Sequence, residues 1–127
     1  MELNGDRPQE VDESKRWRLT VPIQIYIRED LPHLAGHTCD LSLDGVNIEV
    51  GVKLPLKSFI KVEIYFQRGD VFAFIAQEPL KLQGQVMWRK PVESDDHEIW
   101  NTGIRFSSIN PDQQNLIREE VALLDPI

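Results

Sequence analysis

From residue 19 to residue 106, apolar and polar positions alternate along most of the chain with a period of two. In residues 19–27 every second residue is Leu, Val or Ile, which is typical of a half-buried β-strand. Similar patterns predict further strands at residues 38–43, 46–50, 59–66, 71–75, 80–88 and 99–106. Because Pro22 has no N–H to donate, we expect an edge position or a bulge near the start of the first strand.

Turn residues separate these segments. Asp44-Gly45 predicts a hairpin between residues 38–43 and 46–50, and Arg68-Gly69-Asp70 predicts a turn before residues 71–75. Residues 93–97 form a polar loop before the last strand.

The period changes to that of a helix after Asn110. Asn110 is a favourable N-cap, Pro111 suits the first helical position, and Gln113 occupies the capping-box position. The helix is predicted over residues 111–124, with one apolar stripe formed by Leu116, Ile117, Val121 and Leu124. The expected fold is therefore all-β, a small antiparallel barrel of six to seven strands, closed or split, with a C-terminal α-helix.

Composition limits the organisation and the partners of the chain. Its 127 residues suit one domain, which we place at residues 15–124, after a flexible acidic tail at residues 1–14. The 14 Lys and Arg against 21 Asp and Glu give a net charge of −7, which argues against DNA and anionic membranes as partners. The absence of a signal-like start and of a long apolar run, together with a single cysteine, predicts a cytoplasmic protein without membrane insertion.

No arrangement of residues indicates catalysis or a cofactor. The histidines His33, His37 and His97 have no nucleophile pattern beside them, and Pro32 and Gly36 argue against a helix that would bring the first two together. We interpret His33 and His37 as surface residues of a loop, and Cys39 as a small buried residue. The acidic loop at residues 93–98 lacks the glycine-pivoted spacing of a calcium site. We therefore expect no enzyme, no cofactor and no metal site.

Two polar features remain. Lys15, Arg16 and Arg18 precede the first strand, and Asp40, Ser42 and Gly45 surround the predicted hairpin turn. Arginine clamps phosphate and reads guanine bidentately, while a carboxylate accepts from guanine N–H groups. The basic cluster could equally be a solubilising edge of charge. Trp17, between the cations, has two open placements: exposed to solvent, or packed on the barrel.

At these residues the chain resembles the PilZ family, bacterial receptors for cyclic di-GMP. That family carries an Arg-x-x-x-Arg stretch before the first barrel strand and an Asp/Asn-x-Ser-x-x-Gly motif, complete here as Asp40, Ser42 and Gly45. Residues 84–88 and 103–106 also look like the family's Gly-Val-Trp strand and its closing Gly-x-x-Phe strand. The resemblance covers residues 15–124 and implies a barrel that binds cyclic di-GMP.

The arginine stretch departs from the family pattern. If Arg18 is the second arginine, Ser14 occupies the place of the first, and Lys15 and Arg16 are out of register. The resemblance implies that Arg18, with Arg16 or Lys15, holds guanine and phosphate, that Asp40 and Ser42 bond to the nucleotide, and that Gly45 gives it room.

Two functions follow from the resemblance. The first is a non-enzymatic effector whose conformational change on binding cyclic di-GMP regulates motility, exopolysaccharide, pili or virulence. The alternative is a PilZ-type adaptor that binds no nucleotide and acts through an unidentified protein partner. A single-strand nucleic-acid binder is a third class, and the net charge of −7 opposes it.

Overall fold

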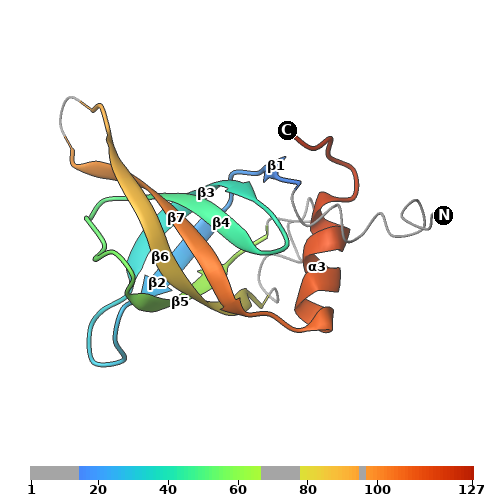
Figure 1. The fold of residues 1–127 in the computed structure, drawn as a ribbon, viewed down its shortest axis with the longest axis horizontal. Helices are drawn as coiled ribbons and strands as arrows, with labels where there is room; N and C mark the ends of the chain where they lie inside the picture. The colour runs from blue at the N-terminus through green and yellow to red at the C-terminus, as the bar shows by residue number, and fades with distance from the viewer. Residues whose placement is uncertain (1–14, 67–77, 95–96) are drawn as a thin grey trace.

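The computed structural model describes residues 15–66, 78–94 and 97–127. Six strands form a closed antiparallel barrel in the order β3-β2-β5-β6-β7-β4, and β4 pairs back with β3. A seventh, β1, extends the sheet beside β3, and one helix, α3, follows the barrel (Figure 1). The bounds are β1 Trp17–Arg18, β2 Pro22–Tyr26, β3 Leu34–Leu41, β4 Gly45–Val50, β5 Phe59–Ile64, β6 Leu80–Val92, β7 Ile99–Ser108 and α3 Pro111–Val121.

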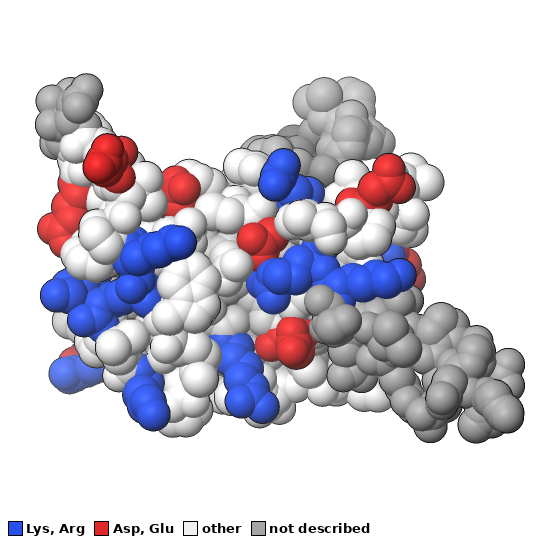
Figure 2. All heavy atoms as spheres, turned by 45° about the horizontal axis from the view of Figure 1, so that its top comes forward, with Lys and Arg blue, Asp and Glu red and all other residues white. Residues whose placement is uncertain are grey.

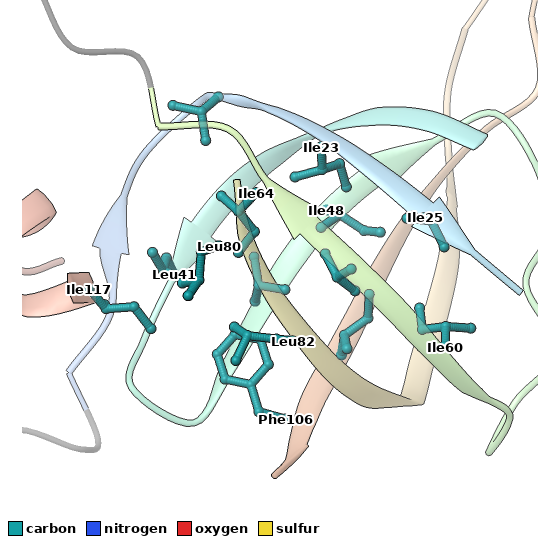
Figure 3. Packing of buried hydrophobic residues seen from close by; sticks show 14 of the residues in the cluster. Ile23, Ile25, Leu41, Ile48, Ile60, Ile64, Leu80, Leu82, Phe106 and Ile117 are labelled. Atoms are coloured by element: carbon teal, nitrogen blue, oxygen red, sulfur yellow. The ribbon is translucent and has the colours of Figure 1, made fainter. Parts of the chain in front are cut away.

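The alternation of apolar residues fills the inside of the barrel. Ile23, Ile25 and Ile48 are almost fully buried and point toward one another from β2 and β4 (Figure 3). The helix α3 lies at one end of the barrel, where the fully buried Ile117 lies close to Leu41. Burial of apolar surface on this scale is the main favourable term in folding.

The helix begins as predicted. The Asn110 side chain accepts a hydrogen bond from the Gln113 backbone N–H at 2.8 Å, and the Gln113 side chain accepts from the Asn110 N–H at 2.9 Å. The predicted end at residue 124 is wrong, because the last regular residue is Val121. Leu124 N–H bonds instead to the Val121 carbonyl at 2.9 Å, a tighter turn that leaves the Leu124 side chain 38% exposed.

Each of the six segments predicted within the described residues contains a strand, in the predicted order, and the short strand β1 is an addition that the pattern did not predict. The bounds differ: β3 begins earlier, β6 and β7 end later, and β2 and β5 are shorter than predicted. Backbone pairing extends β3 back to Leu34 and β6 forward to Val92, although neither extension alternates in polarity. The predicted turn at residues 68–70 and strand at residues 71–75 lie outside the described residues, as does the predicted tail at residues 1–14. Among the described residues, no helix has the length and apolar character needed to cross a bilayer.

Of the two expected placements of Pro22, an edge position or a bulge, the edge position is wrong. Pro22 begins β2, which lies between β3 and β5 in the sheet. Its carbonyl accepts a hydrogen bond from Tyr65 N–H at 3.0 Å, so the residue still contributes to the sheet. The first residue of a strand is one of the few interior positions that tolerates a proline.

A buried threonine joins the two N-terminal strands to β3. Strands β1 and β2 pair with opposite ends of β3 on the same edge, and the chain leaves the regular ladder between them. At this break the Val21 N–H donates to the Thr38 hydroxyl at 2.9 Å, and that hydroxyl donates to the Leu19 carbonyl. Thr38 is 0% exposed and Val21 is buried, so the hydroxyl supplies the acceptor that the buried Val21 N–H needs.

We predict that Thr38→Val destabilises the protein by about 1–3 kcal/mol, because the buried Val21 N–H loses its acceptor while the shape of the side chain is kept. Urea denaturation measures the change, with the exposed Thr20→Val in the same segment as the control. A free energy of unfolding equal to that of the parent would show that the hydroxyl does not join the strands.

Candidate functional site

One row of cross-strand partners runs over the outer face of the barrel. Arg18 pairs with Asp40, Asp40 with Asn47, Asn47 with Gly103, and Gly103 with Trp88. Directly paired residues in an antiparallel sheet have their side chains on the same face. The row therefore brings residues from five strands, 70 positions apart in sequence at its ends, to one surface.

Arg16 lies against the acidic part of this row. Its guanidinium Nε donates to Asp40 Oδ1 at 2.5 Å, and Nη1 donates to Ser42 Oγ at 3.2 Å. Asn47 Nδ2 donates to the second Asp40 oxygen at 3.2 Å. The side chains of Arg16 and Asp40 are only 33% and 21% exposed, so the ion pair is partly shielded from water.

Ser42 holds the turn between β3 and β4. Its side chain is buried, and its hydroxyl donates to Asp44 Oδ1 at 2.5 Å and accepts from the Gly45 N–H at 3.1 Å. In this structure the hydroxyl therefore fixes the turn as well as meeting Arg16.

Gly45 is required for the approach of two strands. A Cβ added there would lie 2.5 Å from the Ile104 carbonyl oxygen of β7. No described glycine has a positive φ, so a left-handed turn is not the reason for this glycine. A glycine at this position can permit either a left-handed turn or a close approach of two backbones, and the structure shows the close approach.

An exposed indole ring lies at the other end of the row. A Cβ added at Gly103 would lie 2.1 Å from Trp88 Nε1, so the ring rests directly on the Gly103 backbone. Trp88 nevertheless remains 40% exposed. Lys90 Nζ lies 5.8 Å from the centre of the ring, within the range of a cation–π interaction.

The space between Arg16 and Trp88 is a shallow pocket of about 210 Å³. Its walls combine the guanidinium of Arg16, the carboxylate of Asp44 and the indole of Trp88 with an amide, which can bind phosphate, accept from a nucleobase edge and stack on a ring. Asp40, which Arg16 contacts, lies beside the pocket and does not line it. Figure 2 shows many Lys and Arg side chains on the face that contains β1, although the chain as a whole is acidic. The lining residues are Arg16, Asp44, Gly45, Asn47, Met87, Trp88, Gly103, Ile104 and Arg105.

The structure separates the predicted cations. Arg16 meets Asp40 and Ser42 directly, whereas the exposed Arg18 side chain lies beside Asp40 in the row without a hydrogen bond to any described residue. Lys15 lines a different pocket, between β1 and the C-terminal end of α3. Trp17 is 8% exposed, so of its two open placements the structure shows the packed one.

The sequence reasoning missed the aromatic and amide parts of the pocket. Trp88 and Gly103 were named only as strand markers of the resemblance, and Asn47 and Arg105 were not singled out. They lie 31 or more positions from Arg16 in the sequence, so no local pattern connects them with it. The cross-strand register, which assembles them, depends on the closed barrel.

Two expectations about β3 are also corrected. His37 lies in the strand and not in a loop, and Cys39 is half-buried and not buried. Burial, followed by the carboxylates of Glu49 and Asp40, raises the pKa of the Cys39 thiol to about 11. A thiol that stays protonated at neutral pH is a poor nucleophile.

We predict that Gly103→Ala displaces the Trp88 ring and lowers stability by about 1–3 kcal/mol, because the new methyl group occupies the space of the indole. The indole N–H resonance of Trp88, assigned with Trp88→Phe, should shift in the NMR spectrum. Gly51→Ala is the matched control, since its nearest non-neighbouring atom would be 3.6 Å away. An unmoved Trp88 resonance in Gly103→Ala would contradict the packing.

Comparisons with solved structures show similar folds. The Bacillus subtilis inhibitor of motility MotI/DgrA aligns over 85% of this chain and 48% of its own, with 13% identity and a TM-score of 0.63. The PilZ domain of YcgR from Escherichia coli with c-di-GMP aligns over 87% and 97%, with 14% identity and a TM-score of 0.59. The PlzA protein of Borreliella burgdorferi in complex with c-di-GMP aligns over 99% and 60%, with 11% identity and a TM-score of 0.63.

The chain spans about half the length of MotI/DgrA and of MrkH from K. pneumonia. No curated protein matches it at a significant level. The family model of the PilZ domain matches residues 12–123, nearly all of the sequence and the whole of the barrel and helix. The chain therefore belongs to the PilZ domain family.

Proposed function

We propose that this chain is a non-enzymatic cyclic di-GMP receptor that binds the nucleotide in the pocket between Arg16 and Trp88. The family and the two neighbours solved with this nucleotide support a function in cyclic di-GMP signalling. The observation that carries the proposal is the convergence of a guanidinium, a carboxylate and an exposed indole on one surface. These are the groups that a guanine ring and a phosphodiester each need.

Each group has a chemical role in the proposal. The indole of Trp88 stacks on a guanine, while Asp40 accepts from the guanine N–H groups. The planar fork of Arg16 binds phosphate or the guanine O6 and N7 atoms, and the exposed Arg18 adds a second cation from the same face. Ser42 and Gly45 keep the β3–β4 turn in the shape that positions Asp40 and Arg16.

Binding has to compete with the contacts of the free protein. Arg16 already neutralises Asp40, so the nucleotide must replace their bond with contacts to its phosphate and to its base. The exchange is favourable when each buried charge receives a new partner, because an unpaired charge is costly. We therefore expect the Arg16 side chain to change its position on binding.

Such a movement would reach the C-terminal end of the chain. The Arg16 carbonyl accepts a hydrogen bond from the Ile127 N–H at 2.8 Å, and Lys15 and Trp17 line a pocket with Val121 and Leu124. A shift of β1 therefore changes the surface beside α3, where a protein partner would detect it. In this proposal that surface controls motility, exopolysaccharide, pili or virulence.

One observation favours the adaptor as a second candidate. Both oxygens of Asp40 already have partners, Arg16 and Asn47, so the free site is satisfied without a ligand. In an adaptor these bonds would only stabilise the fold, and the same face would bind a partner protein. A measurement of cyclic di-GMP binding distinguishes the two functions.

We predict that the parent protein binds cyclic di-GMP in the micromolar range or tighter, about −8 kcal/mol, in a calorimetric titration. Arg16→Ala should bind at least about ten-fold more weakly, since a charge-assisted hydrogen bond contributes about 1.5–3 kcal/mol. Arg16→Lys, which keeps the charge without the planar fork, should be intermediate. Arg28→Ala is the control, because Arg28 pairs with Asp30 in an exposed loop elsewhere.

Equal affinities of Arg16→Ala and the parent would place the nucleotide elsewhere. No heat from the folded parent at any concentration tested would reject the receptor and leave the adaptor.

We also predict that Trp88→Ala weakens binding by about ten-fold, because stacking on one base contributes about 1–3 kcal/mol. The control is Trp100→Ala. Trp100 lies on β7, where its indole N–H donates to Glu98 at 2.6 Å and its ring contacts Lys53, outside the pocket. Calorimetry at one salt concentration compares the two variants, and equal losses would rule out a specific stacking role.

A further inference from the structure

Three side chains with different ligand atoms meet on the outer face of β3 and β4. The imidazole of His37, the thiol of Cys39 and the carboxylate of Glu49 each offer one atom, and these atoms lie within 4.8 Å of one another. His37 Nε2 is 3.3 Å from Glu49 Oε1. None of the three lines the pocket between Arg16 and Trp88.

A β-bulge brings the cluster together. His37 and Glu49 are direct partners across the β3–β4 ladder. Between Thr38 and Asp40 the register shifts, so Cys39 is the extra residue on β3. Thr38 points into the core, and Cys39 remains half-buried beside the other two side chains.

The set of donor atoms selects a borderline-soft cation. Thiolate and imidazole favour zinc and copper over calcium and magnesium, which bind through oxygen atoms. In a tetrahedral zinc site, bonds of about 2.0–2.3 Å place neighbouring ligand atoms about 3.3–3.6 Å apart. The His37 and Glu49 atoms already have this separation, 3.3 Å. The other ligand atoms are at most 4.8 Å apart, so rotation of the exposed His37 and of Glu49 toward Cys39 has to supply no more than about 1.5 Å.

A neighbouring acceptor lacks a partner. Asn101 pairs with Glu49 across the β4–β7 ladder and so belongs to the same outer face. Its Oδ1 atom is buried and has no hydrogen-bond donor among the described residues. Such an atom is suited to accept from a water molecule held by a metal ion nearby.

We propose that His37, Cys39 and Glu49 form a zinc site with three protein ligands and one position for water. Zinc binding releases the thiol proton of Cys39 and replaces it with the metal. The proposal departs from the expectation of no metal site, because Glu49 is ten positions from Cys39 in the sequence and only the hairpin register brings them together. The site does not depend on the proposed binding of cyclic di-GMP.

Cobalt is the probe for this site. The chain contains one cysteine, so a thiolate-to-cobalt charge-transfer band in the near ultraviolet can come only from Cys39. Titration of the reduced full-length chain with Co²⁺ should give this band, together with the visible bands of tetrahedral cobalt, at one ion per chain. Added Zn²⁺ should abolish both, because it binds such sites more tightly.

Variants then test each ligand. Cys39→Ser should remove the charge-transfer band, and His37→Gln and Glu49→Gln should each weaken zinc binding by more than about 100-fold in a chelator competition. Loss of even an outer partner of a ligand commonly costs about 10–100-fold. His33→Gln is the matched control, because His33 is an exposed loop histidine outside the cluster.

Circular dichroism and thermal melting establish that each variant is folded. If Cys39→Ser does not fold, the two other ligand variants still decide the result. Three results would each overturn the proposal. They are the absence of the charge-transfer band in the parent, a stoichiometry of one ion per two chains, and an unchanged zinc affinity in folded His37→Gln and Glu49→Gln.

Discussion

The contact between Arg16 and Asp40 is the interaction on which the candidate site depends. Strand β1 pairs with β3 through only two residues, Trp17 and Arg18, a short ladder for holding a segment in place. Arg16 adds a bond of 2.5 Å to Asp40 just before that ladder. Charge-assisted hydrogen bonds of this kind contribute about 1.5–3 kcal/mol, which is enough to decide where a short strand lies. Trp17, buried between the two arginines, anchors the same segment from the inside.

The closed barrel makes the rest of the site. Closure leaves the outer face of β3, β4, β7 and β6 as one continuous surface, on which a row of partners runs from Arg18 to Trp88. Two glycines permit the close packing that this surface needs. Gly45 lets β4 approach the Ile104 carbonyl, and Gly103 leaves space for the Trp88 ring. The same surface continues past the bulge at Cys39 to the cluster for which we propose zinc.

Local patterns were sufficient for much of the fold. The alternation of Val, Leu and Ile predicted the barrel strands that the structure describes, and Asn110 with Gln113 predicted the start of α3. Both signals depend on residues a few positions apart, so they survive without tertiary information. The end of α3 was predicted less well, because Leu124 fits the apolar stripe although the chain has already tightened into a turn.

The site was only partly predictable. The motif around Asp40, Ser42 and Gly45 predicted the turn that the structure shows between β3 and β4, and the basic cluster contains Arg16, which contacts this turn. Their binding of a ligand stays a prediction. Whether Arg16 or Arg18 contacts the Asp40 carboxylate depends on how β1 pairs with β3, and no local sequence pattern shows this pairing.

Register explains what could not be predicted at all. Trp88 and Gly103 meet Asn47 only through the pairing of β6, β7 and β4, over distances of tens of residues in sequence. Likewise, a bulge in β3 decides that Cys39 lies beside Glu49, and one residue of slip would move its side chain to another face.

An NMR titration of the isotope-labelled chain with cyclic di-GMP tests the central claim most directly, because it observes the Arg16 side chain itself. The account predicts that the Arg16 Nε–H resonance moves as its bond to Asp40 is exchanged, together with the Trp88 indole N–H and the backbone amides of β1 and the β3–β4 turn. Shifts confined to the separate pocket that Lys61 and Lys81 line, with Arg16 and Trp88 unmoved in the bound state, would contradict it.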